Sequence, residues 1–126
     1  MAEVVISQKL LDTILENARV AYPLETILLL RGKVRNGRIE ITDVVIPPLA
    51  IYGKGFSSFP AYMLPMDFSL IGTVHSHPSG TARPSVEDLN RSFGRIIMIV
   101  TYPFLGRKNV IVFNRSGEKI SLQLTE

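Results

Sequence analysis

The residues best suited to chemistry lie in one stretch, "GTVHSHPSGTARPSVEDL" over residues 72–89, which holds both histidines of the chain. Side chains alternate between the two faces of an extended strand, so His75 and His77 should point the same way and Ser76 the opposite way. Pro78 cannot donate a ladder hydrogen bond, so a central strand cannot continue past it. The spacing therefore predicts two imidazoles presented at a strand end, where they could chelate one metal ion.

Asp88 can complete the donor set, because it falls on the first turn of a short helix expected from about Ser85 to Phe93. Two imidazole nitrogens and one carboxylate oxygen suit Zn²⁺ and leave a fourth tetrahedral position open for water. Three protein ligands plus water is the arrangement of a catalytic zinc site, in which the ion brings the pKa of the water towards about 7. The chain has no cysteine, so a metal must bind to His, Asp or Glu.

A metal-activated water also needs a base to take its proton. Glu25 lies where the chain leaves the first predicted helix for an apolar strand. A carboxylate at the edge of a buried sheet is unfavourable unless it has a partner. We therefore expect Glu25 to be the general base.

Each of these residues also has a structural interpretation. Histidines on a strand can simply be packed or solvated, Glu25 can be a solvated strand start, and Ser85 with Asp88 is close to a helix capping box. Other His-x-His sites fit less well. A cupin-type site requires a Glu at the spacing that Thr81 and Ala82 occupy here. An amidohydrolase barrel requires roughly 250 residues.

The elements that would position this site follow from the apolar pattern. Three- and four-residue spacing predicts an amphipathic helix that starts after an N-cap at Ser7 and is closed by Pro23. Asn36-Gly37 predicts an antiparallel hairpin, whose first strand should be buried on both faces from Ile27 to Leu30. Further strands are expected in "SLIGTVHSH", "RIIMIVTY", "NVIVFN" and "KISLQL", the last two joined across "RSG". The predicted fold class is α/β, with a mixed, mainly antiparallel β-sheet flanked by helices.

Length and composition limit what else the chain can be. With 126 residues, 46% of them hydrophobic and 20% charged, it should form one globular domain over residues 1–126. The longest apolar run, "ILLL", is far too short to span a bilayer, so we expect a cytoplasmic protein with no membrane partner. The net charge of +3 is dispersed and lacks interleaved aromatic residues, which argues against nucleic-acid binding.

The residues together resemble the JAMM (MPN+) metalloprotease motif, Glu … His-Ser/Thr-His-Pro … Ser-x-x-Asp. All five motif positions are present: Glu25, His75, His77, Ser85 and Asp88. The size resembles that of the minimal archaeal, desampylase-like isopeptidases of this family. The resemblance implies the MPN fold, a mixed β-sheet with a helix on each side.

The resemblance also implies a role for each motif residue. His75, His77 and Asp88 would bind one catalytic zinc ion. Glu25 would activate the water and then protonate the leaving amine. Ser85 would donate a hydrogen bond to the oxyanion of the tetrahedral intermediate, a contribution on the order of 3 kcal/mol.

The activity that the resemblance implies is that of a zinc-dependent isopeptidase. It would hydrolyse the bond after the C-terminal Gly-Gly of a ubiquitin-like modifier, so the modifier and its conjugates are the expected partners. One alternative is a peptidase that trims C-terminal residues from a sulfur-carrier protein with the same site. A second alternative is a non-enzymatic scaffold of the same fold.

Residues 47–60, "PPLAIYGKGFSSFP", hold three prolines and two glycines and predict a loop. Its apolar residues Ile51, Tyr52, Phe56 and Phe59 could grip the globular modifier. Equally, they could fold back over a helix or form the contact of a homodimer.

Overall fold

The computed structural model describes residues 3–47, 51–53, 56–58, 69–91 and 94–126. Its elements, in chain order, are β1 (Glu3–Ser7), α1 (Gln8–Ala21), β2 (Ile27–Arg35), β3 (Arg38–Val45), β4 (Ile51–Gly53), β5 (Phe56–Ser58), β6 (Leu70–His77), α2 (Val86–Arg91), β7 (Ile96–Thr101), the 3-10 helix η2 (Arg107–Asn109), β8 (Val110–Asn114) and β9 (Lys119–Thr125).

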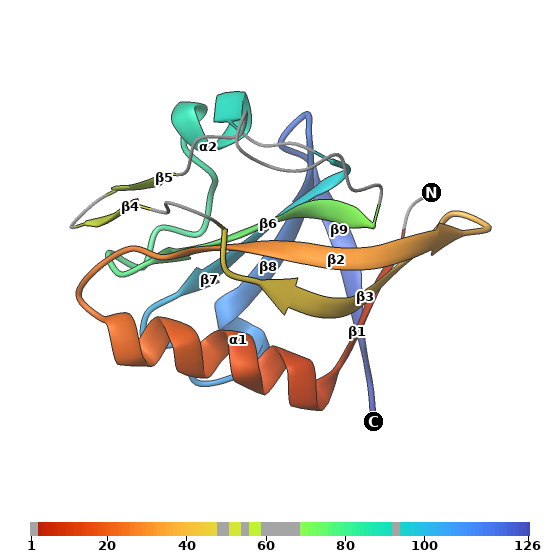
Figure 1. The fold of residues 1–126 in the computed structure, drawn as a ribbon, viewed down its shortest axis with the longest axis horizontal. Helices are drawn as coiled ribbons and strands as arrows, with labels where there is room; N and C mark the ends of the chain where they lie inside the picture. Colours follow the sequence, from red (N-terminus) through yellow and green to blue (C-terminus); the bar gives the residue numbers. More distant parts are fainter. Residues whose placement is uncertain (1–2, 48–50, 54–55, 59–68, 92–93) are drawn as a thin grey trace.

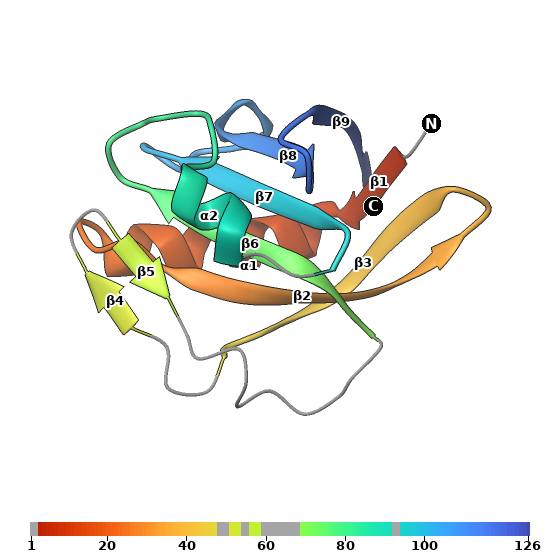
Figure 2. The ribbon, with the colours of Figure 1, turned by 90° about the horizontal axis from the view of Figure 1, so that it is seen from above.

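Seven of these strands form a closed barrel in the order β1-β3-β2-β6-β7-β8-β9. β1 is parallel to both β3 and β9, β6 is parallel to β7, and the other neighbours are antiparallel. α1 and α2 lie on opposite sides of this sheet (Figure 1 and Figure 2). The predicted α/β class, with a mixed sheet flanked by helices, is confirmed.

Closure of the barrel was not predicted, and it depends on β1. This strand pairs with β3 on one side and with β9 on the other, so it joins the two ends of the sheet. Its apolar residues Val4, Val5 and Ile6 are buried. Because both partners are distant in sequence, the pairing that defines this short strand has no local turn signal.

α1 begins and ends where the sequence predicts. Ser7 is the N-cap, and its hydroxyl accepts a hydrogen bond from the backbone N–H of Leu10 at 3.1 Å. The helix ends at Ala21, just before the Tyr22-Pro23 peptide bond. Its buried residues are Leu11, Ile14, Leu15 and Ala18, which pack into the main core. In the described part of the chain, no helix is long and apolar enough to cross a membrane.

The β2–β3 hairpin also agrees with the prediction. Asn36 and Gly37 take left-handed φ values of 52° and 75°, which glycine and asparagine tolerate best. Ile27 to Leu30 are fully buried on both faces of β2. This strand is therefore a central one, with β3 on one side and β6 on the other.

Residues 47–60 differ from the predicted loop. Ile51–Gly53 and Phe56–Ser58 form a separate antiparallel sheet of two strands, β4 and β5. This small hairpin stands beside α2 at the end of the barrel where β6 finishes (Figure 1 and Figure 2). Phe59 and the side chains of Ile51, Tyr52 and Phe56 lie outside what the structure describes, so their contact with a modifier stays a prediction.

β6 and β7 run parallel at the centre of the fold and have two differently packed faces. Met98 and Val100 of β7 join the core that contains α1. Ile97 and Ile99 instead form a second cluster with Phe113, against which Leu89 of α2 packs. His75 lies beside Ile99 in the β6–β7 register, so its side chain belongs to the face covered by α2.

The close approach of β6 to β7 requires glycine at position 72. A Cβ on Gly72 would lie 2.2 Å from the carbonyl oxygen of Ile96, a backbone atom that cannot move without breaking the ladder. We predict that Gly72→Ala lowers the free energy of unfolding by about 2–3 kcal/mol. Urea denaturation followed by circular dichroism measures this change.

Gly106→Ala is the matched control, because a Cβ there meets nothing within 4 Å and its φ of −179° suits any residue. Equal stability of the two variants would contradict the proposed tight packing of β6 on β7.

Candidate active site

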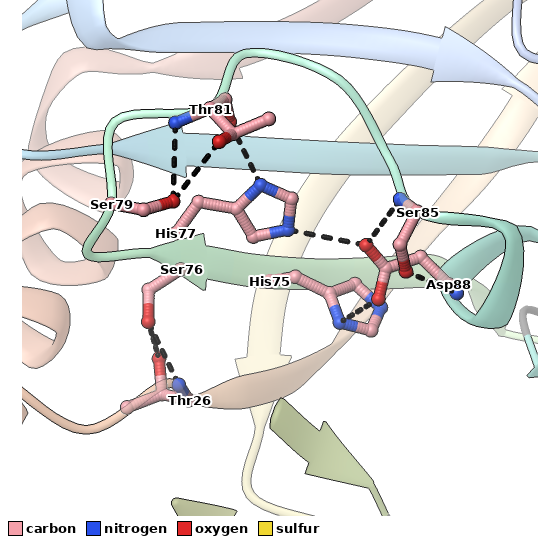
Figure 3. Close-up of polar contacts among 8 residues, drawn as sticks. All are labelled: Thr26, His75, Ser76, His77, Ser79, Thr81, Ser85 and Asp88. Atoms are coloured by element: carbon pink, nitrogen blue, oxygen red, sulfur yellow. Dashed lines mark hydrogen bonds and ion pairs between the residues drawn. The ribbon is translucent and has the colours of Figure 1, made fainter. Parts of the chain in front are cut away.

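The predicted site residues His75, His77, Asp88 and Ser85 come together between the end of β6 and the start of α2 (Figure 3). The side chains of His75 and His77 reach the same carboxylate from neighbouring positions on one face of the strand. His77 Nε2 lies 3.1 Å from Asp88 Oδ2, and His75 Nδ1 lies 3.4 Å from Asp88 Oδ1. Ser76, between the histidines, points to the other face, as the alternation predicts.

His77 is held in a defined orientation by the backbone. Its Nδ1 lies 2.8 Å from the carbonyl oxygen of Thr81. A carbonyl only accepts, so Nδ1 carries a proton and donates it, which turns Nε2 towards Asp88. By accepting the Nδ1 proton, the Thr81 carbonyl fixes the tautomer in which Nε2 can bind a metal.

The turn after β6 places that carbonyl. The N–H of Gly80 donates to the carbonyl of His77 at 3.0 Å, and Gly80 has a φ of +82° that favours glycine. Ser79 holds Thr81 on the far side of this turn, since its Oγ lies 3.0 Å from the hydroxyl of Thr81. The segment "PSGT" therefore turns the chain and also orients the His77 ring.

His75 is the most deeply buried of the site's titratable groups. Its side chain is 3% exposed. Among the described residues neither ring nitrogen has a hydrogen-bond partner, and Nδ1 makes only the 3.4 Å contact with Asp88 Oδ1. Burial lowers the pKa of His75 to about 4, against the opposing effect of the Asp88 charge. At neutral pH the ring is therefore uncharged and has a lone pair available for a ligand.

Asp88 and Ser85 form a reciprocal capping arrangement at the start of α2. The N–H of Asp88 donates to Ser85 Oγ at 3.0 Å, and the N–H of Ser85 donates to Asp88 Oδ2 at 2.9 Å. This is the capping-box geometry with aspartate in place of the usual glutamate. The cap and the candidate ligand are therefore the same residue, and the cap aims its carboxylate at the histidines.

The charges of this cluster are coupled. Burial of Asp88 would raise its pKa, but hydrogen bonds from His77 and from the backbone of Ser85, together with the nearby His75, lower the pKa to about 2. Burial of His77 would lower its pKa, but its hydrogen bonds to Asp88 and to the Thr81 carbonyl raise the pKa above its ordinary value. Each residue therefore favours the charged form of the other, so Asp88 is stabilised as the ionised carboxylate and His77 as the protonated imidazole.

Glu25 reaches the site across the β2–β6 pairing. Ile27 lies opposite His75 in this antiparallel register, so continuing it by two residues sets Glu25 opposite His77. Directly opposed residues share a face of the sheet. Glu25 is half-buried, and this burial raises the pKa of its carboxyl group. The charge of His77 acts to lower the pKa, and the charge of Asp88 acts to raise it, so the pKa lies above its ordinary value. A carboxylate with a raised pKa is suited to accept and return a proton.

The donor chemistry of this cluster fits a divalent cation such as zinc. It combines two neighbouring imidazoles with an ionised carboxylate, and the His75 imidazole is neutral and has no hydrogen bond to the described residues. No group of three such side chains in the described ranges is spaced as an assembled metal site. Asp88 contacts the rings directly instead, and a cation held by the three residues would replace those contacts.

Two contributors to the site were missed at the sequence level. The Thr81 carbonyl has no signal in the sequence, because any residue carries one. Thr26 was also missed, although it is a polar residue next to Glu25 at the start of an apolar run. Its hydroxyl and N–H both contact Ser76.

The raised pKa of His77 predicts how metal affinity depends on pH. A proton on Nε2 competes with a metal for the same lone pair, so affinity should be constant above this pKa and fall about tenfold per pH unit below it. His75, with a pKa of about 4, remains neutral over this range. Chelator competition with Zn²⁺ between pH 5 and 8 measures the effect. Affinity that is unchanged down to pH 5 would contradict a ligand role for His77.

Comparison with known proteins agrees with this geometry. Residues 7–115 match the family model described as prokaryotic homologs of the JAB domain. A probable metalloprotease from Haloferax volcanii is 34% identical over 96% of this chain and 79% of its own length.

Solved structures give the same result. A JAB1/MPN domain protein from Archaeoglobus fulgidus is 36% identical, covers both chains completely and superposes with a TM-score of 0.70. A second structure, described as a JAMM metalloprotease-like zinc site in the proteasome and signalosome, is 33% identical over both full chains with a TM-score of 0.67. The chain belongs to the prokaryotic JAB-domain family of metalloprotease-like proteins.

Proposed function

We propose that this protein is a zinc-dependent isopeptidase that hydrolyses the bond after the C-terminal Gly-Gly of a ubiquitin-like modifier. The observation that supports this most directly is the convergence of His75, His77 and Asp88 on one face of the sheet, with Glu25 opposite His77. The likeness to a probable metalloprotease and to a structure with a metalloprotease-like zinc site supports the same class of chemistry.

His75, His77 and Asp88 are the residues that would hold the ion. When bound, zinc would make a water molecule more acidic and polarise the carbonyl group under attack. The deep burial of His75 and the bond from His77 to the Thr81 carbonyl limit the motion of both rings. The ligands are thus preorganised by the fold.

Glu25 moves the proton in this proposal. One of its carboxylate oxygens accepts a proton from the attacking water as the new carbon–oxygen bond forms. The same oxygen then gives the proton to the lysine amine as the carbon–nitrogen bond breaks. Burial raises the pKa of Glu25, which makes both transfers easier near neutral pH.

In this proposal, Ser85 stabilises the charge that develops on the carbonyl oxygen. Its Oγ accepts the Asp88 N–H, so the hydroxyl proton can be donated elsewhere. Ser85 is exposed and lies beside the candidate ligand Asp88, where a substrate can reach it. A hydrogen bond to the oxyanion strengthens as the negative charge grows.

The β4–β5 hairpin offers a way to hold the modifier's tail. Within the described strands, β4 and β5 pair only with each other, so each has a second backbone edge for an extended peptide. The hairpin stands beside α2 near the end of β6 (Figure 2). A tail that added a strand there would run close to the candidate site.

The test of this function is cleavage of a Gly-Gly-linked conjugate by the zinc-loaded protein. We expect Glu25→Gln to lower kcat by about 10²- to 10⁴-fold, because the proton shuttle is lost while the metal ligands remain. Chelator should abolish cleavage, and zinc should restore it.

Glu40→Gln is the matched control, since Glu40 is a half-buried carboxylate that pairs with Arg35 on the β2–β3 hairpin. Undiminished cleavage by Glu25→Gln would overturn the mechanism. Offering a linear Gly-Gly extension beside the isopeptide conjugate tests the substrate. Consumption of only the linear extension would favour the sulfur-carrier peptidase, and consumption of neither would favour a scaffold.

Ser85 allows a second prediction, because its two roles can be separated. Ser85→Ala removes both the cap and the donor, whereas Ser85→Gly keeps most of the capping free energy. We expect both variants to lose kcat by about 10²- to 10³-fold. Only Ser85→Ala should also lose about 1 kcal/mol of stability, measured by urea denaturation. A loss of kcat that instead follows stability would show that Ser85 acts only as a cap.

A further inference from the structure

Thr26 and Ser76 form a buried polar contact directly behind the site (Figure 3). The N–H of Thr26 donates to Ser76 Oγ at 2.7 Å, and the Thr26 hydroxyl lies 3.0 Å from the same oxygen. The N–H of Ser76 in turn donates to the carbonyl of Thr26 at 3.1 Å. The two residues are 3% and 1% exposed. Three hydrogen bonds thus join one residue pair.

Each partner of this contact has a site residue as its neighbour. Ser76 lies between His75 and His77, and Thr26 follows Glu25. Because side chains alternate along a strand, Thr26 and Ser76 meet on one face while Glu25 and the histidines occupy the other. The contact therefore fixes the spacing between the candidate base and the candidate ligands without touching the substrate side.

The two sides of the contact are not equally fixed by the rest of the fold. β6 is paired along its length with β2 and with β7, up to His77 opposite Thr101. Glu25 lies outside β2, which begins at Ile27, so among the described residues it belongs to no continuous strand ladder. The histidines are thus held by ladders on both sides, whereas the described hydrogen bonds that tie the Glu25 segment to β6 are those between Thr26 and Ser76.

We propose that Thr26 is a positioning residue for Glu25, acting through its hydrogen bonds to Ser76. This inference rests on the proposed function for its catalytic consequence, but its structural part is independent of activity. The Thr26 hydroxyl fixes the backbone that carries the base, and the side chain itself does not touch the reacting atoms.

Thr26→Val tests the proposal, because it removes the hydroxyl while preserving the shape of the side chain and the N–H bond to Ser76. We expect kcat on a Gly-Gly-linked conjugate to fall by about tenfold or more, since small displacements of a catalytic group are costly. KM and zinc affinity should stay within about twofold of the wild-type values. Thr26→Ser keeps the hydroxyl and should recover most of kcat.

Thr73→Val is the matched control. Thr73 is a fully buried threonine on β6, and its hydroxyl has no hydrogen-bond partner in the part of the chain that the structure describes. Removing it makes an equivalent chemical change without losing a bond, so kcat should remain within about twofold of the wild type.

Hydrogen–deuterium exchange gives a measurement that does not require activity. In Thr26→Val, peptides covering residues 24–27 should exchange about tenfold faster, whereas those covering residues 73–77 should be unchanged. Thr73→Val should show neither change.

The outcomes separate the two hypotheses. A Thr26→Val protein with normal kcat and normal exchange at residues 24–27 would overturn the role of Thr26. So would a loss of zinc affinity that parallels the loss of kcat, because the contact would then position the ligands. Wild-type protein that cleaves no conjugate would overturn the proposed function, and the exchange measurement would still decide whether Thr26 holds the Glu25 segment.

Discussion

The candidate site depends on the register between β2 and β6. Because Ile27 opposes His75, Glu25 falls opposite His77 and Thr26 opposite Ser76. A slip of one residue would turn the histidines towards the α1 side and separate them from Asp88. The register is held by the apolar burial of Ile27–Leu30 on both faces of β2, by the burial of β6, and by the close approach of β6 to β7 at Gly72. Packing in the core therefore determines the geometry of the polar cluster.

The second constraint is the start of α2. A helix cap normally satisfies free backbone N–H groups, and Asp88 and Ser85 do this for each other. The same geometry points the Asp88 carboxylate at both imidazoles and leaves Ser85 exposed beside it. The cap and the site are thus one arrangement, so a structural role for these residues supports the catalytic role proposed for them.

Much of the fold and the grouping of the site were predictable because their signals are local. The spacing of His75 and His77 on a strand, the Asn36-Gly37 turn and the apolar periodicity of α1 each depend on neighbouring residues. What was missed depends on distant pairing or on the backbone. β1 is a strand because it pairs with β3 and β9, which are distant in sequence. The orientation of His77 depends on the backbone carbonyl of Thr81, which a residue of any type would carry.

The structure also helps to choose between the two interpretations of the histidines. A buried histidine with only a packing role normally has its ring nitrogens hydrogen-bonded, because an unpaired buried polar atom is unfavourable. His77 meets this expectation through Thr81 and Asp88. Within the described part of the chain, Nε2 of His75 has no hydrogen-bond partner, and its Nδ1 has only the 3.4 Å contact with Asp88 Oδ1. A buried imidazole beside Ile99 with so few polar partners is unfavourable for stability. Since local conflicts with stability are expected mainly at functional positions, the unsatisfied ring favours a ligand role for His75 over simple packing.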